Sequence, residues 1–179
     1  MDTESRYTCF AHQQHLGSGN SAEIARLARL HPERPLWVFD DATGRPVDLD
    51  LRAREADIAT PESGPEGRGR GRPRLGVIAR EVTLLPRHWD WLATQRGGAS
   101  VALRKLIDEA RRANADADTR RRCQDRCYHF MSAIAGDLPG FEEAIRALYA
   151  SDQVALLQHT AGWPADIVAH LQRLLDPDF

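Results

Sequence analysis

The chain has 179 residues, 42% hydrophobic and 28% charged, which is ordinary for a globular protein and enough for one medium domain or two small ones. No apolar run approaches the roughly 18 residues that suggest a membrane span, and the polar N-terminus does not resemble a secretory signal. Three cysteines do not make a disulfide framework. We therefore expect a cytoplasmic protein with no membrane partner.

The net charge of −2 hides an uneven distribution along the sequence. Residues 1–67 carry −5, residues 68–112 carry +7 and residues 113–179 carry −4. A polyanion should therefore approach the middle of the chain. The simpler alternative is an arginine-rich stretch that is solvated and has no partner.

Residues 1–52 are expected to form a small α+β module with the element order ββαββ. Apolar runs predict strands at 7–11, 15–18 and 36–39. Helical spacing of apolar residues predicts a helix at 21–30, capped by Asn20 or Ser21. The alternation of apolar and acidic residues at 46–51 predicts the last strand.

Residues 53–74 form a predicted flexible linker, because a segment rich in proline, glycine and serine cannot bury apolar area. The linker ends in an arginine arm, which consists of Arg68, Arg70, Arg72 and Arg74. The arm resembles an AT-hook, whose arginine-glycine-arginine-proline core lies in the minor groove of A·T-rich DNA. A looser phosphate-binding arm and a linker with no ligand are the alternatives.

Residues 75–112 are predicted to form a strand (75–85), a helix (87–95) and a second helix (100–112), with Gly97-Gly98 as the turn. This unit resembles the ribbon-helix-helix fold. Members of that family are obligate dimers, in which one strand from each chain forms an antiparallel ribbon that enters the major groove of DNA.

The resemblance assigns DNA contacts to two parts of the unit, and the sequence offers three further candidates. Polar residues of the ribbon, here Arg80, Glu81 and Thr83, would lie near the major groove. The backbone amides of Ala99 and Ser100 would hold a phosphate, as helix N-termini can. Further candidate phosphate partners are Arg87, Arg104 and Lys105.

One departure from the ribbon-helix-helix pattern concerns the strand register. We expect Val82 and Leu84 to face the core, because burial of an unpaired Glu81 would cost more than exposure of a leucine. Few polar side chains are then left to read bases, so a ribbon that serves only dimerisation is the alternative. Trp89 and Trp91 cannot share a helix face, so we expect one in the core and the other exposed or at an interface.

Residues 113–179 are expected to form a C-terminal helical bundle, with helices at 118–135, 140–150, 152–160 and 164–175. The pair Cys123 and Cys127 could hold a metal from one side, but core cysteines are the simpler interpretation. Turn chemistry likewise explains the carboxylates around Asp40-Asp41 better than catalysis does. We therefore expect no catalytic residues, no metal and no cofactor.

Taken whole, the chain resembles an uncharacterised bacterial family known only as a domain of unknown function. The resemblance is clearest at residues 38–44, 71–91, 97–112 and 136–141. That family implies no activity. The residues themselves favour a homodimer that binds double-stranded DNA, as a transcriptional regulator or nucleoid-associated factor, and that is not an enzyme. A dimerisation or protein-interaction module without nucleic-acid binding is the alternative.

Overall fold

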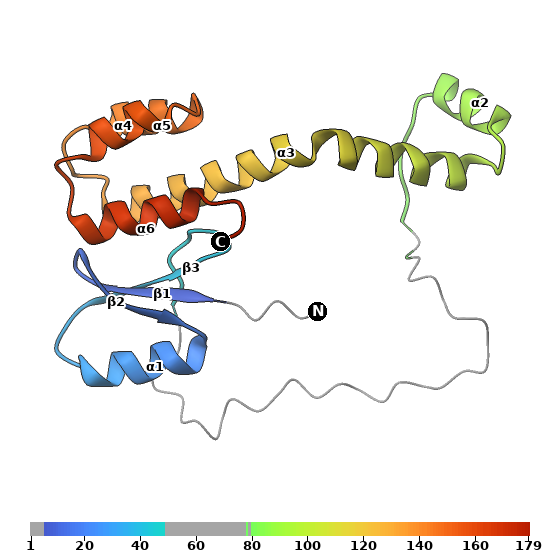
Figure 1. Cartoon of the computed structure of the whole chain (residues 1–179). Helices are drawn as coiled ribbons and strands as arrows, with labels where there is room; N and C mark the ends of the chain where they lie inside the picture. Colours follow the sequence, from blue (N-terminus) through green and yellow to red (C-terminus); the bar gives the residue numbers. More distant parts are fainter. Residues whose placement is uncertain (1–5, 49–77, 79) are drawn as a thin grey trace, which may run out of the picture. The chain divides into compact units, whose positions relative to one another are not determined.

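The computed structural model describes residues 6–48, 78 and 80–179 (Figure 1). The fold of these residues is α+β, as expected. The strands are β1 (Tyr7–Ala11), β2 (Gln14–Gly19) and β3 (Leu36–Asp40), and the helices are α1 (Ser21–Leu30), α2 (Pro86–Thr94), α3 (Ala99–Ile134), α4 (Phe141–Tyr149), α5 (Gln153–Thr160) and α6 (Ala165–Leu175). The described residues divide into two compact units, the first containing 6–48 and 116–179 and the second containing 78 and 80–115.

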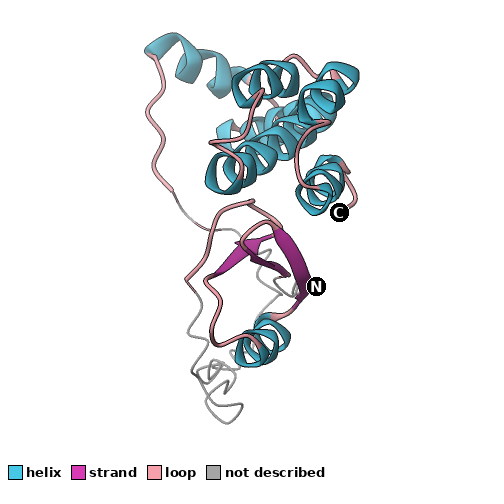
Figure 2. Ribbon diagram, turned by 90° about the vertical axis from the view of Figure 1, so that its left-hand side faces the viewer, coloured by secondary structure: helices cyan, strands magenta, loops and turns pink. Residues whose placement is uncertain are grey.

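The sheet of the first unit is antiparallel, with the strand order β2-β1-β3. The central strand β1 is covered on both faces, because α1 packs on one side and the C-terminal helices pack on the other (Figure 2). Cys9 therefore packs with Ile24 of α1, whereas its neighbour Phe10 packs against Phe130 of α3. This alternation is what a strand dictates, since successive side chains point to opposite faces.

Helix α1 begins at a capping box. The Asn20 side chain accepts a hydrogen bond from the Glu23 amide at 3.0 Å, and the Glu23 carboxylate accepts one from the Asn20 amide at 2.9 Å. Of the two expected caps, the structure uses Asn20. Burial of the apolar face decreases along the helix: Ile24 is fully buried, whereas Leu30 is exposed.

The N-terminal module and the C-terminal helices share one hydrophobic core. Phe10 and Phe39 of the sheet join Phe130 of α3 and Leu171 of α6 in a single cluster. The Phe39 and Phe130 rings meet edge to face with their centroids 4.9 Å apart. Two segments that are far apart in the sequence therefore depend on each other for burial.

The prediction of a strand at 46–51 is wrong for residues 46–48, the part of it that the structure describes. Pro46 forms only an isolated bridge with Phe39, and the Val47 amide donates to the Val38 carbonyl at 2.8 Å before the pairing stops. Proline has no N–H to donate to a ladder, so it is a poor start for a strand that must pair. Residues 49–51 lie outside the described residues, and the described part of the module has the order ββαβ.

The two helices predicted at 100–112 and 118–135 are one helix, α3, of 36 residues. The segment between them contains Ala113, Ala115 and Ala117, and no glycine or proline interrupts α3. Alanine is the best helix former, so the helix continues through this segment and the predicted break is wrong. The helices α4, α5 and α6 begin and end within one residue of their expected bounds.

Candidate functional site

The second unit is a helical hairpin whose turn depends on two glycines. Helix α2 begins with Pro86 in its first turn, where a missing N–H costs nothing. Gly97 and Gly98 have φ values of 92° and 78°, a left-handed conformation that glycine adopts without strain. The chain then enters α3, where the amides of Val101 and Ala102 donate to the Gly98 carbonyl. The predicted first helix, the glycine turn and the start of the second helix are confirmed, whereas the predicted end of the second helix at 112 is wrong.

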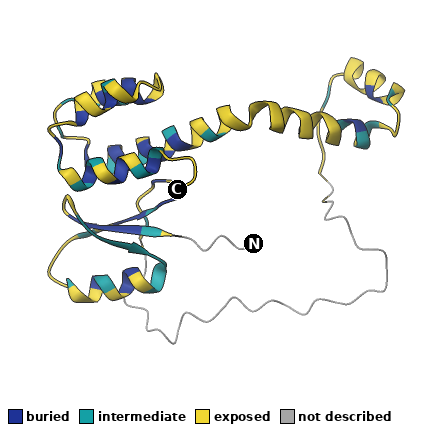
Figure 3. Cartoon of the chain, in the orientation of Figure 1, coloured by how far each residue is buried: buried dark blue, intermediate teal, exposed yellow. Residues whose placement is uncertain are grey.

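This hairpin buries little of its apolar surface. Among the hydrophobic residues described in this unit, only Leu92 and Ala102 are fully buried. The exposed large hydrophobic residues of the same unit are Ile78, Val82, Leu85, Trp89, Trp91, Leu106 and Ile107. Figure 3 shows exposed residues along most of α2 and along α3 from residue 104 to the middle of the helix, whereas the first residues of α3 are mostly intermediate or buried. Neither tryptophan is in the core: Trp89 is 42% exposed and Trp91 is 50% exposed, because the described residues of this unit supply no element that covers the outer faces of the hairpin.

An apolar groove of about 370 Å³ runs between α2 and α3. We use the term apolar groove for the surface lined by Leu84, Arg87, His88, Trp91, Leu92, Leu103 and Leu106. Leu84 is half-buried there, whereas Val82 is 57% exposed, so only one of the two strand residues expected to face inward does so.

The expected ribbon strand is absent from its described part. Residues 78 and 80–85 have no strand structure, and 75–77 and 79 lie outside the described residues. A ribbon of the ribbon-helix-helix type pairs across two chains, and none of the described strands pairs with residues 80–85. Arg80, Glu81 and Thr83 are exposed.

The remaining predicted DNA-binding residues divide into three groups. Arg68, Arg70, Arg72 and Arg74 lie outside the described residues. The start of α3 brings Ala99, Ser100, Arg104 and Lys105 within two turns of one another. The Arg104 Nε donates to the Ser100 carbonyl at 3.0 Å, so this guanidinium is held beside the helix N-terminus. Arg87 lies apart from this group, on the apolar groove.

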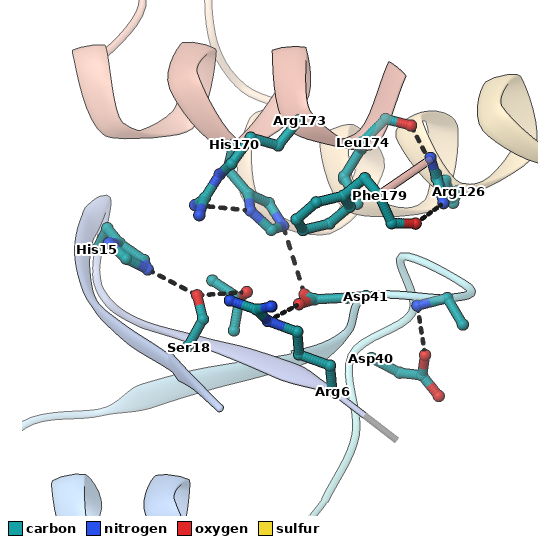
Figure 4. A network of polar contacts seen from close by, with 12 residues as sticks. Arg6, His15, Ser18, Asp40, Asp41, Arg126, His170, Arg173, Leu174 and Phe179 are labelled. Carbon is teal, nitrogen blue, oxygen red and sulfur yellow. Dashed lines mark hydrogen bonds and ion pairs between the residues drawn. The ribbon is translucent and has the colours of Figure 1, made fainter. Parts of the chain in front are cut away.

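The first unit contains a buried polar cluster that sequence reasoning missed (Figure 4). Asp41 follows β3, and His170 lies on α6. The Asp41 Oδ1 and the His170 Nε2 are 3.9 Å apart, and both side chains are almost fully buried. Within the described residues, neither Asp41 carboxylate oxygen nor the His170 Nε2 has a hydrogen-bond partner.

Burial controls the protonation of this pair. It raises the pKa of Asp41, and the nearby Thr8 hydroxyl and Arg6 guanidinium only partly oppose this effect. It lowers the pKa of His170 to about 3, with further lowering by the positive charge of Arg173. At neutral pH His170 is therefore an uncharged imidazole, and its Nδ1 lies 3.2 Å from an Arg173 nitrogen.

A second polar chain connects the strands beside this pair. The His15 Nε2 lies 3.0 Å from the Ser18 hydroxyl, which is 2.8 Å from the Thr8 hydroxyl. The His15 amide also donates to the Asp166 carboxylate at 2.9 Å, which connects β2 to α6. The contacts of Ser18 with Thr8 and His15 join β1 to β2. Burial lowers the pKa of His15, and the charge of Arg173 adds to this effect.

A family model matches residues 6–175, and its description is "Uncharacterized protein conserved in bacteria (DUF2239)". The chain belongs to this family. The match covers both units, which confirms the full-length resemblance seen in the sequence. The chain has no significant match among curated proteins or among solved structures.

In this DUF2239 protein the three cysteines are free and buried. Burial raises the pKa of Cys9 to about 11 and that of Cys127 to about 12, so neither is a reactive thiol at neutral pH.

No group of three or more histidine, cysteine or acidic side chains in the described ranges is arranged to hold a metal ion. None of the described helices has the length and apolar character that a membrane crossing requires.

The carboxylates near β3 have separate roles. Asp40 accepts hydrogen bonds from the amides of Ala42 and Thr43, the turn chemistry that the sequence indicates. Its neighbour Asp41 turns into the unit and meets His170. The adjacent acidic pair was the only sequence signal for this cluster, and no motif connected it to a histidine of α6.

Proposed function

We propose that this DUF2239 protein is a homodimer that binds double-stranded DNA through its second unit and the arginine arm, as a transcriptional regulator or a nucleoid-associated factor. The observation that carries this proposal is the uncovered apolar surface of the helical hairpin. A unit with two fully buried hydrophobic residues and seven large exposed ones among its described residues cannot be stable through its own core. A second copy of the same hairpin supplies the missing apolar partner.

Charge supports the choice of DNA as ligand. The described residues 78 and 80–115 carry seven arginine and lysine residues against four acidic ones, and the arginine arm directly precedes them in the sequence. Exposed Arg80 and Lys105 and the first turn of α3 offer donors to phosphate oxygens. With few polar residues on the expected ribbon, backbone and minor-groove contacts supply most of the affinity.

The same apolar surface also supports a second function, dimerisation without nucleic-acid binding. Both functions need the second copy, and only the first needs the arginines. The electrostatic part of DNA binding falls steeply with salt, by a slope of about 0.9 per phosphate neutralised in a plot of log affinity against log salt concentration. Salt dependence therefore separates the two.

The test is an electrophoretic mobility shift with fragmented bacterial genomic DNA, repeated between about 50 and 300 mM salt. We expect a shift at low salt that weakens steeply as salt rises. Combined alanine substitution of Arg70, Arg72 and Arg74 should weaken binding at least tenfold and reduce the salt slope.

The matched control removes three arginines from the first unit, at Arg26, Arg34 and Arg146, and should leave most of the shift. Absence of a shift at low salt would rule out DNA binding and leave the dimerisation module. An equal loss of binding in both triple variants would show that total charge matters and the arginine arm does not.

A further inference from the structure

The first unit contains a cavity of about 380 Å³ between α3, the α4–α5 corner and the segment after α6. We call it the α3–α5 cavity. Ala147, Leu148 and Leu156 form an apolar floor, and Asp116, Arg120 and Cys123 of α3 form one wall. These three wall residues share a face because their spacings of four and three residues match the helical repeat. The volume lies at the lower end of the range for small-molecule sites, roughly 300–1,000 Å³.

Most polar groups around the cavity already have partners within the protein. Gln124 on the same wall donates to the Leu148 carbonyl at 2.8 Å and so ties α3 to the end of α4. The Asp152 carboxylate, also on the lining, accepts from the Ala155 amide at 2.9 Å and caps α5. The Cys123 sulfur lies 3.6 Å from an Arg126 nitrogen.

Among the charged residues of the lining, Asp116 and Arg120 are the exceptions, and both are exposed. An acidic residue four positions before a basic one is the order that favours an ion pair on a helix. Nevertheless, within the described residues neither side chain has a hydrogen bond or an ion pair. The cavity wall thus presents one uncommitted positive charge and one uncommitted negative charge, one helical turn apart, above an apolar floor.

We propose that the α3–α5 cavity binds a free α-amino acid with an apolar side chain. Arg120 would receive the carboxylate, which a guanidinium binds through two parallel hydrogen bonds. Asp116 would receive the ammonium group, and the side chain would lie on Leu148 and Leu156. The Asp152 carboxylate adds negative charge nearby, so a ligand with a carboxylate but no ammonium group fits less well. This site is independent of the proposed DNA binding.

The test measures binding by isothermal titration calorimetry with three probes that share one apolar group. L-phenylalanine has both charges, 3-phenylpropanoate lacks the ammonium group, and 2-phenylethylamine lacks the carboxylate. We expect L-phenylalanine, or L-leucine or L-methionine if the cavity prefers an aliphatic chain, to bind at least tenfold more tightly than the single-charge analogues. Removal of either charge-assisted hydrogen-bonding group from the ligand should reduce affinity by about tenfold or more.

Variants assign the two charges. Arg120→Gln should reduce amino-acid affinity about tenfold and leave the affinity for 2-phenylethylamine unchanged. Asp116→Asn should also reduce amino-acid affinity about tenfold and leave the affinity for 3-phenylpropanoate unchanged. Arg121→Gln and Asp118→Asn remove the same charges from α3 outside the cavity lining and should change nothing.

Two results would overturn the proposal. The first is that none of the three amino acids binds at a concentration of about 10 mM, because a specific site of this kind should have a dissociation constant well below that concentration. The second is binding that the Arg120 and Asp116 variants leave unchanged, because the amino acid would then occupy another place.

Discussion

Asp41 and His170 meet in the interior of the first unit, with 3.9 Å between the carboxylate oxygen and the imidazole nitrogen. One follows β3 and the other lies on α6, so the pair connects the sheet to the C-terminal helices (Figure 4). The His170 ring is also surrounded by the rings of Phe10, Phe130 and Phe179. An uncharged imidazole fits this environment, and an imidazolium does not.

His170 should therefore make the protein sensitive to acid. Its pKa is about 3 in the folded protein and about 6.5 in the unfolded chain, so below pH 6.5 the unfolded state binds more protons. The stability contributed by neutral His170 is fully present above that pH and is lost as the pH falls towards 3. We expect His170 to lower the free energy of unfolding by up to about 1.4 kcal/mol per pH unit in this window. The raised pKa of Asp41 acts in the opposite direction at the acidic end, because the folded state binds that proton more readily than the unfolded chain does.

The measurement is chemical denaturation at several pH values between about 4.5 and 7.5. His170→Phe keeps an aromatic ring and should flatten the profile below pH 6.5. His159→Gln removes an exposed histidine and should leave the profile as in the wild type. A profile that is equally steep without His170 would assign the acid sensitivity to other groups.

Gly44 should tolerate no side chain. Its φ is 66°, and a Cβ at this position would lie 1.8 Å from the Arg126 carbonyl oxygen of α3. Gly44→Ala should therefore destabilise the first unit by about 3 kcal/mol or more, through backbone strain and displacement of the turn after β3. Thermal unfolding would measure the loss. Gly162→Ala, where a Cβ meets no atom within 4 Å, is the control, and equal Tm values for both variants would contradict the close packing of this turn.

Arg126 holds the end of α6 from within. Its buried guanidinium donates to the carbonyl oxygens of Leu174, Asp176 and Phe179. Arg126→Met keeps the apolar stem but leaves these acceptors without their donor, and should cost about 3 kcal/mol of stability. Hydrogen exchange should show faster opening of the C-terminal turn of α6. Arg121→Met, at an exposed site on the same helix, should have little effect, and unchanged exchange in the Arg126 variant would contradict this capping role.

Sequence patterns identified local elements much better than long-range contacts. The run at 7–11, the cap at Asn20 and the glycine turn at 97–98 act through neighbours in the chain, so their residue types indicate the structure directly. The meeting of Asp41 with His170 depends on tertiary packing, and no spacing rule connects residues so far apart. The predicted gap between the helices at 100–112 and 118–135 is wrong, because the alanine-rich segment between them has an intrinsic helical preference.

The capping box of α1 provides a quantitative check on this local reasoning. Asn20→Ala removes the acceptor for the Glu23 amide and should reduce stability by about 1 kcal/mol. Ser21→Ala, one position later, removes a hydroxyl without a capping role and should be nearly neutral. Urea denaturation of the two variants measures the difference, and equal stability would mean that the box contributes nothing.

The central claim is that the helical hairpin needs a second copy to cover its apolar surface. Sedimentation equilibrium at micromolar concentration tests it most directly, with the wild type beside Trp91→Glu on the apolar groove and Leu157→Glu on an exposed face of α5 as the matched control. The account predicts a wild-type dimer, a monomeric or at least tenfold weaker Trp91→Glu variant, and a dimeric control. A wild-type monomer, or a dimer that Trp91→Glu leaves intact, would contradict it.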